Sequence, residues 1–205
     1  MAGEEVVLVA GLWMPSLAMK LLAGRLAAAG FVPRLFAYRG RDPFEANVAR
    51  LAGFVAGLPP ARRHFVGHSL GGVLVLNTLA QRRDASVASA VLIGAPVRGC
   101  HAGRRLGSVA IGRWMMGASR PLWDERAAAW PRREPLGVIA GTAPIGLGRV
   151  LGAFPGANDG VVCVSETRVE GAAAHVEVPV GHSALIVSRH VARLVARFVA
   201  SATFQ

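Results

Sequence analysis

A serine at the centre of a glycine-rich turn is the residue of this sequence best suited to covalent chemistry. The segment Gly67–Gly72 reads Gly-His-Ser-Leu-Gly-Gly, a G-x-S-x-G pattern centred on Ser69. A short apolar run precedes the pattern and a stretch of helical spacing follows it, as a nucleophilic serine on a sharp strand-to-helix turn requires. Glycines two residues before and after Ser69 remove Cβ atoms that would clash in such a turn. The pattern also occurs by chance in glycine-rich chains, but the flanking elements favour a nucleophile.

A serine hydroxyl needs a base, and the base needs an acceptor that fixes its tautomer. Among the six histidines, His182 follows the last predicted strand and precedes the last predicted helix, where ligands of open α/β sheets bind. Asp159 lies between Ser69 and His182 and completes the chain order Ser, Asp, His of a known triad arrangement. Its Asn-Asp-Gly context is also good turn chemistry by itself, and Glu166 is the reserve candidate for the acid.

Short apolar runs alternate along the chain with longer stretches of helical spacing, the pattern of an α/β sheet built from βαβ units. The six predicted strands are Val6–Gly11, Val32–Ala37, His64–Gly67, Ala90–Gly94, Leu136–Gly141 and His175–Val178. The predicted helices are Ser16–Ala29, a helix capped by Asp42 with Pro43 at its first position, Leu70–Arg83 and Ser183–Ala200. Continuous apolar strands predict a mostly parallel sheet with helices on both faces. A length of 205 residues fits a single domain, 1–205.

The chain resembles the α/β-hydrolase superfamily, and within it the small bacterial lipases and esterases, over nearly its whole length. Gly67–Gly72 looks like the lipase nucleophile elbow. Asn158–Val162 is similar to the segment that holds the acid in many bacterial lipases, and Gly181-His182 is similar to their histidine loop. The resemblance implies acyl transfer in which Ser69 is the nucleophile, His182 the base and Asp159 the acid.

The resemblance also implies an oxyanion hole made of two backbone amides. In that family the loop after the first core strand donates one N–H, from the residue after a His-Gly pair, and the residue after the serine donates the other. Here the pair reads Ala10-Gly11, so Leu12 and Leu70 are the implied donors, with Trp13 as the donor if the loop is shifted by one. Trp13 is also a candidate substrate-binding residue. Such chemistry needs no metal or organic cofactor.

Residues 98–134 interrupt the alternation of strands and helices and carry eight arginines against three acidic residues. We interpret them as a cap-like insertion, partly helical around Leu106–Met116 and too short for a core of its own. Trp114 and Met115 are candidate substrate-binding residues of an acyl-chain groove. Arginines beside tryptophans suit an anionic lipid surface or a substrate phosphate, so peripheral membrane contact stays open. The alternative is that this segment simply covers one end of the sheet, with tryptophans packed beneath solvated arginines.

Composition excludes several classes of function. The net charge of +11 suits polyanions, but the arginines are scattered and aromatic residues make up 6%, too few for base stacking, so we expect no nucleic-acid partner. Two cysteines, Cys100 and Cys163, cannot form a disulfide framework or a four-thiolate zinc site, and no cluster has metal-ligand spacing. The apolar runs are too short to span a bilayer. An acidic start that leads directly into a strand is unlike a secretory signal, so we expect a cytoplasmic protein.

The expected function is hydrolysis of a small-molecule or lipid carboxylic ester through an acyl-enzyme intermediate. A thioesterase or acyltransferase would use the same residues and differ in the acceptor of the acyl group. A catalytically silent binding protein of the same fold is the alternative of a different class, and the presence of Ser69, Asp159 and His182 argues against it. Nothing in the sequence indicates an oligomeric state.

Overall fold

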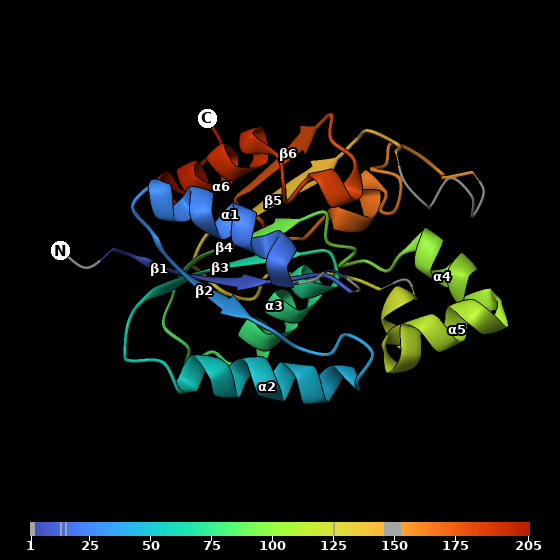
Figure 1. Cartoon of the computed structure of the whole chain (residues 1–205), viewed down its shortest axis with the longest axis horizontal. Coiled ribbons are helices and arrows are strands. Elements are labelled where there is room, and N and C mark those ends of the chain that lie inside the picture. The colour runs from blue at the N-terminus through green and yellow to red at the C-terminus, as the bar shows by residue number, and fades with distance from the viewer. Residues whose placement is uncertain (1–2, 13, 15, 125, 146–152) are drawn as a thin grey trace.

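Six short strands form one fully parallel sheet at the centre of the computed structural model (Figure 1). The structure describes residues 3–12, 14, 16–124, 126–145 and 153–205. The strands are β1 (Glu5–Val9), β2 (Val32–Phe36), β3 (Arg63–His68), β4 (Val87–Ile93), β5 (Leu136–Gly141) and β6 (Ala174–Val178). Their order in the sheet is β2-β1-β3-β4-β5-β6, so the chain reverses its direction of travel across the sheet after β2. In open parallel sheets such a reversal marks where ligands bind, outside the carboxyl ends of the strands.

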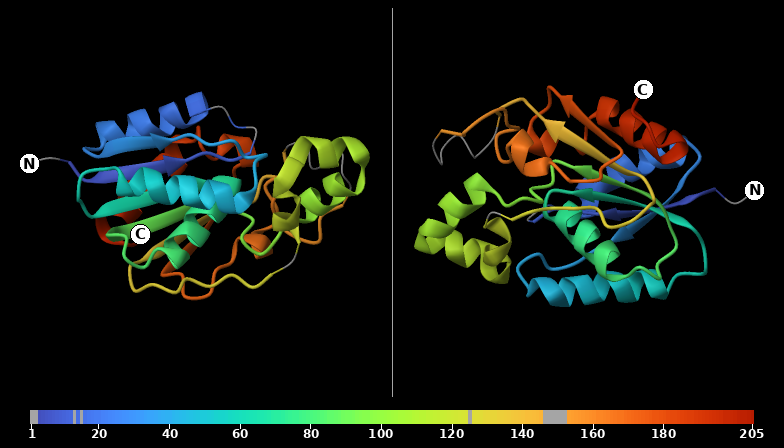
Figure 2. Two further views of the ribbon diagram at one scale, coloured as in Figure 1. Left: turned by 90° about the horizontal axis from the view of Figure 1, so that it is seen from below. Right: turned by 180° about the vertical axis from the view of Figure 1, so that it is seen from behind.

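Helices cover both faces of the sheet. They are α1 (Ser16–Ala28), α2 (Phe44–Ala56), α3 (Leu70–Gln81) and α6 (Arg189–Ser201), with α1 and α6 on one face and α2 and α3 on the other (Figures 1 and 2). Each face has its own apolar core: Leu22, Leu26 and Phe198 lie in one cluster, and Leu51 and Leu74 lie in the other. The inner strands β1, β3, β4 and β5 are therefore buried from both sides, whereas the edge strands β2 and β6 are only partly buried. None of the helices formed by the described residues has the length and apolar character needed to cross a bilayer.

The six strands and the α/β class predicted from the sequence are confirmed, with small shifts at the ends. The strand expected at Ala90–Gly94 begins earlier, at Val87, and ends at Ile93 because Gly94 has a positive φ of 52°. The first strand, expected at Val6–Gly11, begins at Glu5 and ends at Val9. The sheet is wholly parallel rather than mostly parallel.

Two predictions about helix starts are wrong. Asp42 does not cap α2, because the helix begins after Pro43 and the Asp42 carboxylate accepts a 2.6 Å hydrogen bond from Arg50 instead. The last helix does not begin at Ser183. A short 3-10 helix, η4 (His182–Ala184), comes first, and α6 begins after Ser188, whose hydroxyl accepts the N–H of Val191.

The segment that follows β4 stands beside the carboxyl end of the sheet (Figure 2). We call residues 98–134 the cap. It contains α4 (His101–Ser108), α5 (Ala110–Met116) and the 3-10 helix η1 (Gly117–Trp123), so the helical character expected around Leu106–Met116 is present. The tryptophans Trp123 and Trp130 are buried and join the core on the α2 and α3 face, whereas Trp114 is exposed. The cap is thus anchored to the main core by aromatic packing.

Candidate active site

Ser69 occupies a strained turn between β3 and α3. Its φ of 54° and ψ of −125° place it in a region that residues with a Cβ rarely adopt, and the turn persists because its neighbours pack very closely. A Cβ at Gly67 would lie 2.5 Å from the Cα of Gly72, and a Cβ at Gly71 would collide with the carbonyl oxygen of Ala10. The glycines that flank the serine in the sequence are therefore required by backbone contact, and the turn presents the Ser69 side chain at the carboxyl edge of the sheet.

The structure brings Ser69, His182 and Asp159 into one hydrogen-bonded line. The Ser69 Oγ lies 3.0 Å from Nε2 of His182, and Nδ1 of the same ring lies 2.7 Å from Oδ2 of Asp159. A carboxylate only accepts hydrogen bonds, so Nδ1 carries the proton and Nε2 of the neutral ring accepts the serine hydroxyl. This is the arrangement in which a histidine can remove the serine proton. Their catalytic roles stay a prediction.

Asp159 is completely buried and held on both oxygens. Its Oδ1 accepts the backbone N–H groups of Val161 and Val162 at 2.9 Å and 2.7 Å, while Oδ2 faces His182. A carboxylate buried without such donors would be costly, and here both oxygens have hydrogen-bond partners. The Asn-Asp-Gly turn chemistry seen in the sequence and the acidic role are therefore compatible, because the turn supplies the amides that hold the carboxylate.

The reserve acid, Glu166, is engaged elsewhere. Its side chain accepts the N–H of Cys163 at 2.8 Å at the start of the 3-10 helix η3 (Val164–Thr167), and it also accepts the N–H of His101 at the start of α4. Burial raises the pKa of this carboxyl. Glu166 thus links the cap to the segment that follows Asp159.

His68, the residue before the serine, supports the histidine loop. Its ring is buried, its Nε2–H donates to the backbone oxygen of His182 at 3.2 Å, and the two ring centroids are 4.9 Å apart. Burial, with a smaller contribution from the nearby His182, lowers the pKa of His68 to about 3. A neutral ring at this position avoids a second positive charge beside the base. The sequence showed His68 only as a turn residue, and its contact with His182 depends on a tertiary approach that no local pattern reveals.

Two backbone amides close to the Ser69 turn, those of Leu12 and Leu70, have no hydrogen-bond acceptor among the described residues. Leu70 is the first residue of α3, so its N–H has no partner within the helix. Leu12 follows β1 in the neighbouring loop, and within the described part of the chain neither amide has an acceptor. Both residues implied by the family resemblance are thus placed at the carboxyl edge beside Ser69 with unused donors, although no bound group tests their role. The alternative donor, Trp13, lies outside the described residues.

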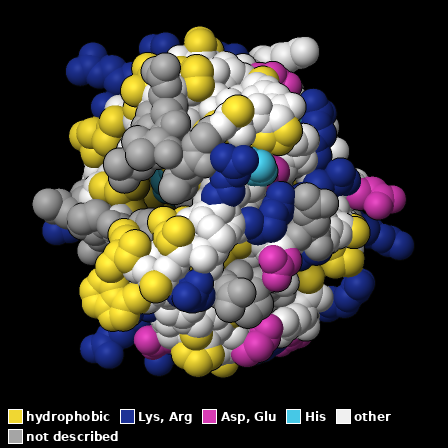
Figure 3. Space-filling view, turned by 90° about the vertical axis from the view of Figure 1, so that its right-hand side faces the viewer, with side chains coloured by type: hydrophobic (Ala, Val, Ile, Leu, Met, Phe, Trp, Pro, Cys, Tyr) yellow, Lys and Arg dark blue, Asp and Glu magenta, His cyan; other side chains and the backbone are white. Residues whose placement is uncertain are grey.

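A cleft adjoins this edge. It has a volume of about 590 Å³, within the usual range for small-molecule sites. The lining residues are Gly11, Leu12, Met14, Tyr38, Arg39, Gly40, Arg41, Asp42 and Gly117. Gly11 connects the cleft to the serine, since a Cβ on Gly11 would lie 2.8 Å from the Cβ of Ser69. Figure 3 views the molecule from this end of the sheet, with cationic side chains crossing the middle of the face beside hydrophobic ones.

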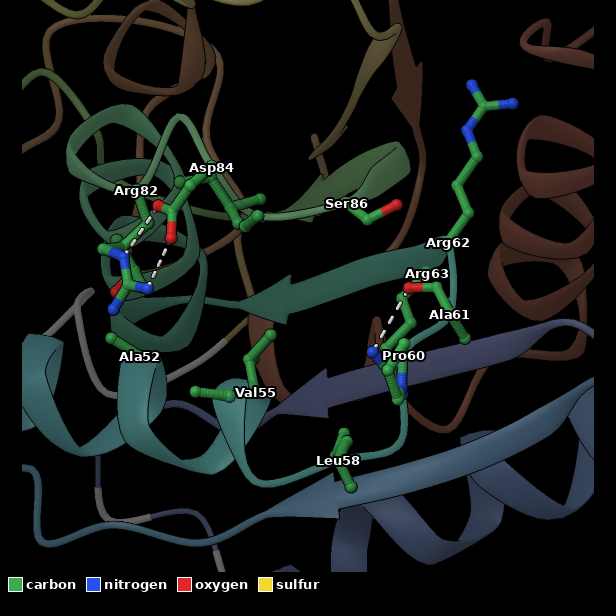
Figure 4. A pocket seen from close by; sticks show the side chains of 14 residues that line it. Ala52, Val55, Leu58, Pro60, Ala61, Arg62, Arg63, Arg82, Asp84 and Ser86 are labelled. Atoms are coloured by element: carbon green, nitrogen blue, oxygen red, sulfur yellow. Dashed lines mark hydrogen bonds and ion pairs between the residues drawn. The ribbon is translucent and has the colours of Figure 1, made fainter.

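A second cavity lies at the opposite end of the molecule. It has a volume of about 410 Å³ between α2, α3 and the segments that lead into β3 and β4 (Figure 4). Arg82 and Asp84 form an ion pair at its edge. Because Ser69 follows the carboxyl end of β3 and this cavity lies at the amino end, the cavity takes no part in the site around Ser69.

The predicted substrate-binding residues have different positions. Trp114 is 64% exposed on α5, with the Arg41 guanidinium stacked 4.7 Å from its ring centroid, and neither Trp114 nor Met115 lines the cleft described above. Trp13 lies outside the described residues. A substrate contact for these three residues therefore stays a prediction.

Two glycines that the sequence analysis missed make room for the triad. A Cβ on Gly94, which follows β4, would lie 3.2 Å from Oδ2 of Asp159 and 3.3 Å from Nδ1 of His182. A Cβ on Gly141, the last residue of β5, would lie 2.7 Å from the Cβ of Asp159. The available signal was a glycine at the carboxyl end of each of these predicted strands.

Among the described residues, no group of three or more histidine, cysteine, aspartate or glutamate side chains is arranged to hold a metal ion. Burial raises the pKa of Cys100 to about 12 and that of Cys163 to about 11, so both thiols are protonated at neutral pH. Neither thiol is therefore suited to act as a nucleophile or a metal ligand.

Comparison of the sequence with protein-family models and with curated proteins gives no match. The structure, in contrast, is similar to solved esterases and lipases. A metagenomic carboxyl esterase matches with a TM-score of 0.73, covering 98% of this chain and 77% of its own at 21% identity. A Bacillus licheniformis lipase in its mature form gives 0.74, with 98% and 93% covered at 18% identity. An extracellular α/β-hydrolase from a Paenibacillus species gives 0.62, with 98% and 99% covered at 14% identity. The chain therefore has the α/β-hydrolase fold, as its sequence predicted.

Proposed function

We propose that the protein is a serine hydrolase that cleaves carboxylic esters, with Ser69 as nucleophile, His182 as general base and Asp159 as its partner. The observation that carries the proposal is the hydrogen-bonded line from Ser69 Oγ through the His182 ring to Asp159, built on a strained elbow. Solved proteins of similar structure include a carboxyl esterase and a lipase, which supports the same reaction class.

The geometry supports a two-step acyl transfer. The Ser69 oxygen attacks the ester carbonyl as its proton moves to Nε2 of His182, and Asp159 stabilises the resulting imidazolium through Nδ1–H. The amides of Leu12 and Leu70 receive the oxyanion of the tetrahedral intermediate. The His182 proton then passes to the departing alcohol, and an acyl group stays on Ser69. Water, deprotonated by His182, attacks this acyl-enzyme and releases the acid and the free serine.

The test is labelling by a fluorophosphonate probe, combined with turnover of 4-nitrophenyl esters from acetyl to palmitoyl. The wild-type protein should be labelled and should hydrolyse at least one ester, and Ser69→Ala should do neither. The chain-length profile then separates a short-chain esterase from a lipase.

The chain contains a matched control serine. Ser89 in β4 also lies beside a histidine, with its Oγ 2.8 Å from Nδ1 of His64, but it is buried in the sheet and has no elbow. Ser89→Ala should therefore keep both labelling and turnover. If the wild-type protein is folded but neither labels nor turns over any ester, the protein is a non-catalytic member of its fold class and the proposal is wrong.

A further inference from the structure

The cleft beside Ser69 is the place where part of an ester substrate must lie. Gly11 borders both the cleft and the serine, and Leu12, whose amide is a proposed oxyanion donor, forms part of the wall. In the proposed reaction a carbonyl carbon at Ser69 with its oxygen at the Leu12 amide lies next to this cleft, so the cleft offers space for one of its two substituents. Gly117 of the cap also lines the cleft, against the Arg41 backbone.

The charges on the cleft wall are unbalanced. Of the lining residues, Arg39, Arg41 and Asp42 are charged, and the Asp42 carboxylate is taken by Arg50, which lies outside the wall, at 2.6 Å. Arg41 donates to the backbone oxygen of Trp114 at 2.7 Å and stacks on its ring, so its partners are neutral and its charge remains. The cleft is thus positive even though it contains an acidic residue.

Arg39 has an exposed side chain with no hydrogen-bond or ion-pair partner among the residues that the structure describes. Some exposed arginines have an acidic partner, as Arg34 has Glu5 and Arg82 has Asp84. A carboxylate stands three residues from Arg39, that of Asp42, but it is bound to Arg50. Arg39 therefore lines the cleft without an acidic partner among the described residues.

The backbone that carries Arg39 is fixed in place. Its carbonyl oxygen accepts the side-chain amide of Asn47 at 2.9 Å and the N–H of Asp42 at 3.0 Å. Asn47 is buried, and its Oδ1 accepts Arg50, the same arginine that holds Asp42. This network, in which Asn47 is buried and Arg50 is exposed, both positions the Arg39 backbone and engages Asp42, the one carboxylate among the described residues that line the cleft. Because the backbone at Arg39 is already fixed, binding of an anion there carries a smaller cost for ordering the loop.

We propose that Arg39 and Arg41 form an anion-binding subsite of this cleft, separate from the oxyanion hole, so that the preferred esters carry a carboxylate or a phosphate. The inference rests on the proposed ester hydrolysis and names its substrate class. A planar guanidinium binds either group through paired N–H donors. Arg39 is the specificity-determining residue, since Arg41 also holds the cap through Trp114.

The test compares two esters of equal chain length, mono-4-nitrophenyl glutarate, which has a terminal carboxylate, and neutral 4-nitrophenyl pentanoate. Arg39→Gln should lower kcat/KM for the glutarate about tenfold or more, because a charge-assisted hydrogen bond is lost. It should change kcat/KM for the pentanoate by no more than about twofold. Raising the salt concentration should reduce the preference of the wild-type protein for the glutarate.

Arg193→Gln is the matched control, since it removes one exposed positive charge from α6 on the far side of the sheet. This variant should leave the ratio of kcat/KM for the glutarate to kcat/KM for the pentanoate unchanged. The subsite would be overturned if Arg39→Gln lowered kcat/KM equally for both esters. It would also be overturned if Arg193→Gln changed the ratio of the two kcat/KM values as much as Arg39→Gln does. A second ester pair is monobutyrin and butyryl glycerol 3-phosphate, whose hydrolysis is measured by the release of protons. Comparison of the two ester pairs shows whether the preferred anion is a carboxylate on the acyl side or a phosphate on the alcohol side.

A titration without catalysis separates this inference from the proposed function. Glutarate should bind Ser69→Ala in a calorimeter and should bind the Ser69→Ala/Arg39→Gln double variant more weakly, by about tenfold. If no ester is hydrolysed but the two variants differ in their affinity for glutarate, the proposed function is wrong and the anion-binding subsite stands. If both proteins bind glutarate equally, the subsite is wrong whatever the activity.

Discussion

Asp159 and His182 are joined by two hydrogen bonds, one through a side chain and one through the backbone. Oδ2 of Asp159 accepts Nδ1–H of His182 at 2.7 Å, and the backbone oxygen of Asp159 accepts the backbone N–H of His182 at 2.9 Å. The second bond fixes the loop and the first fixes the ring, so the imidazole is oriented before any substrate arrives. The two bonds also separate what the carboxylate does from what the loop does.

Asp159→Asn should remove activity and leave the fold intact. An asparagine Oδ1 can still accept the amides of Val161 and Val162, while its NH₂ group facing His182 favours the wrong tautomer of the ring. We expect kcat to fall by about 10⁴, as happens when the acid of a serine triad is amidated. Ester turnover measures the loss, and a melting curve checks the fold. Asn158→Asp, an adjacent half-buried change of similar size that keeps an Oδ1 acceptor for the N–H of Gly160, should retain most of the activity. A comparable loss there would show that the turn, not the carboxylate, matters.

Glu166→Gln should affect stability more than chemistry. Glu166 accepts the N–H groups of Cys163 and His101 and has no contact with His182, so a glutamine can satisfy one amide but meets the other with its NH₂ group. A buried donor left without an acceptor costs about 1 to 3 kcal/mol, which denaturant unfolding should detect. We expect kcat to fall by less than about tenfold. A loss equal to that of Asp159→Asn would assign the acid to Glu166 instead.

Gly94→Ala should displace Asp159 and His182, because the new Cβ would press against both side chains. Gly94 has a φ of 52°, and its new Cβ would lie 2.8 Å from Cδ1 of Leu185 and 3.2 Å from Oδ2 of Asp159. We expect a loss of about 1 to 3 kcal/mol in the free energy of unfolding, together with lower kcat. Gly24→Ala is the control, because its Cβ meets nothing within 4 Å inside α1, and it should stabilise the protein by about 0.5 to 1 kcal/mol. Unchanged kcat in Gly94→Ala would contradict the role of close packing in positioning Asp159.

The parts of the site that could be predicted from sequence are those governed by local rules. The turn at Ser69 needs glycines at fixed offsets, and the helix after it follows from apolar spacing, so both are visible in Gly67–Gly72. The positions of Asp159 and His182 after strands follow from the rule that parallel strands bring their carboxyl ends to one edge. These residues were therefore accessible without a structure.

The remainder depends on contacts between distant segments. Asp42 has the sequence context of a helix cap, but Arg50 lies within reach and offers a charged partner, so pairing prevailed over capping. Gly94 looks like an ordinary strand end until Asp159 is placed 3.2 Å from where its Cβ would be. Likewise the three tryptophans of the cap look equivalent in sequence, yet only tertiary packing buries Trp123 and leaves Trp114 outside.

Neutral, buried His68 should make the stability of the protein depend on pH in mildly acidic solution. Its pKa is lowered from 6.5 to about 3, mainly by burial, so the unfolded chain takes up a proton at this residue below pH 6.5 while the folded chain does not. The stability is therefore complete above the unfolded pKa and falls as the pH decreases toward 3. His68→Gln lacks this titration but keeps a donor for the His182 carbonyl oxygen. Between about pH 6 and about pH 4 the wild-type protein should lose roughly 2.5 kcal/mol more than His68→Gln in the free energy of unfolding, measured in urea. Other buried histidines such as His64 titrate in both proteins and cancel from the difference. Parallel pH profiles of the two proteins would mean that His68 takes up a proton without unfolding.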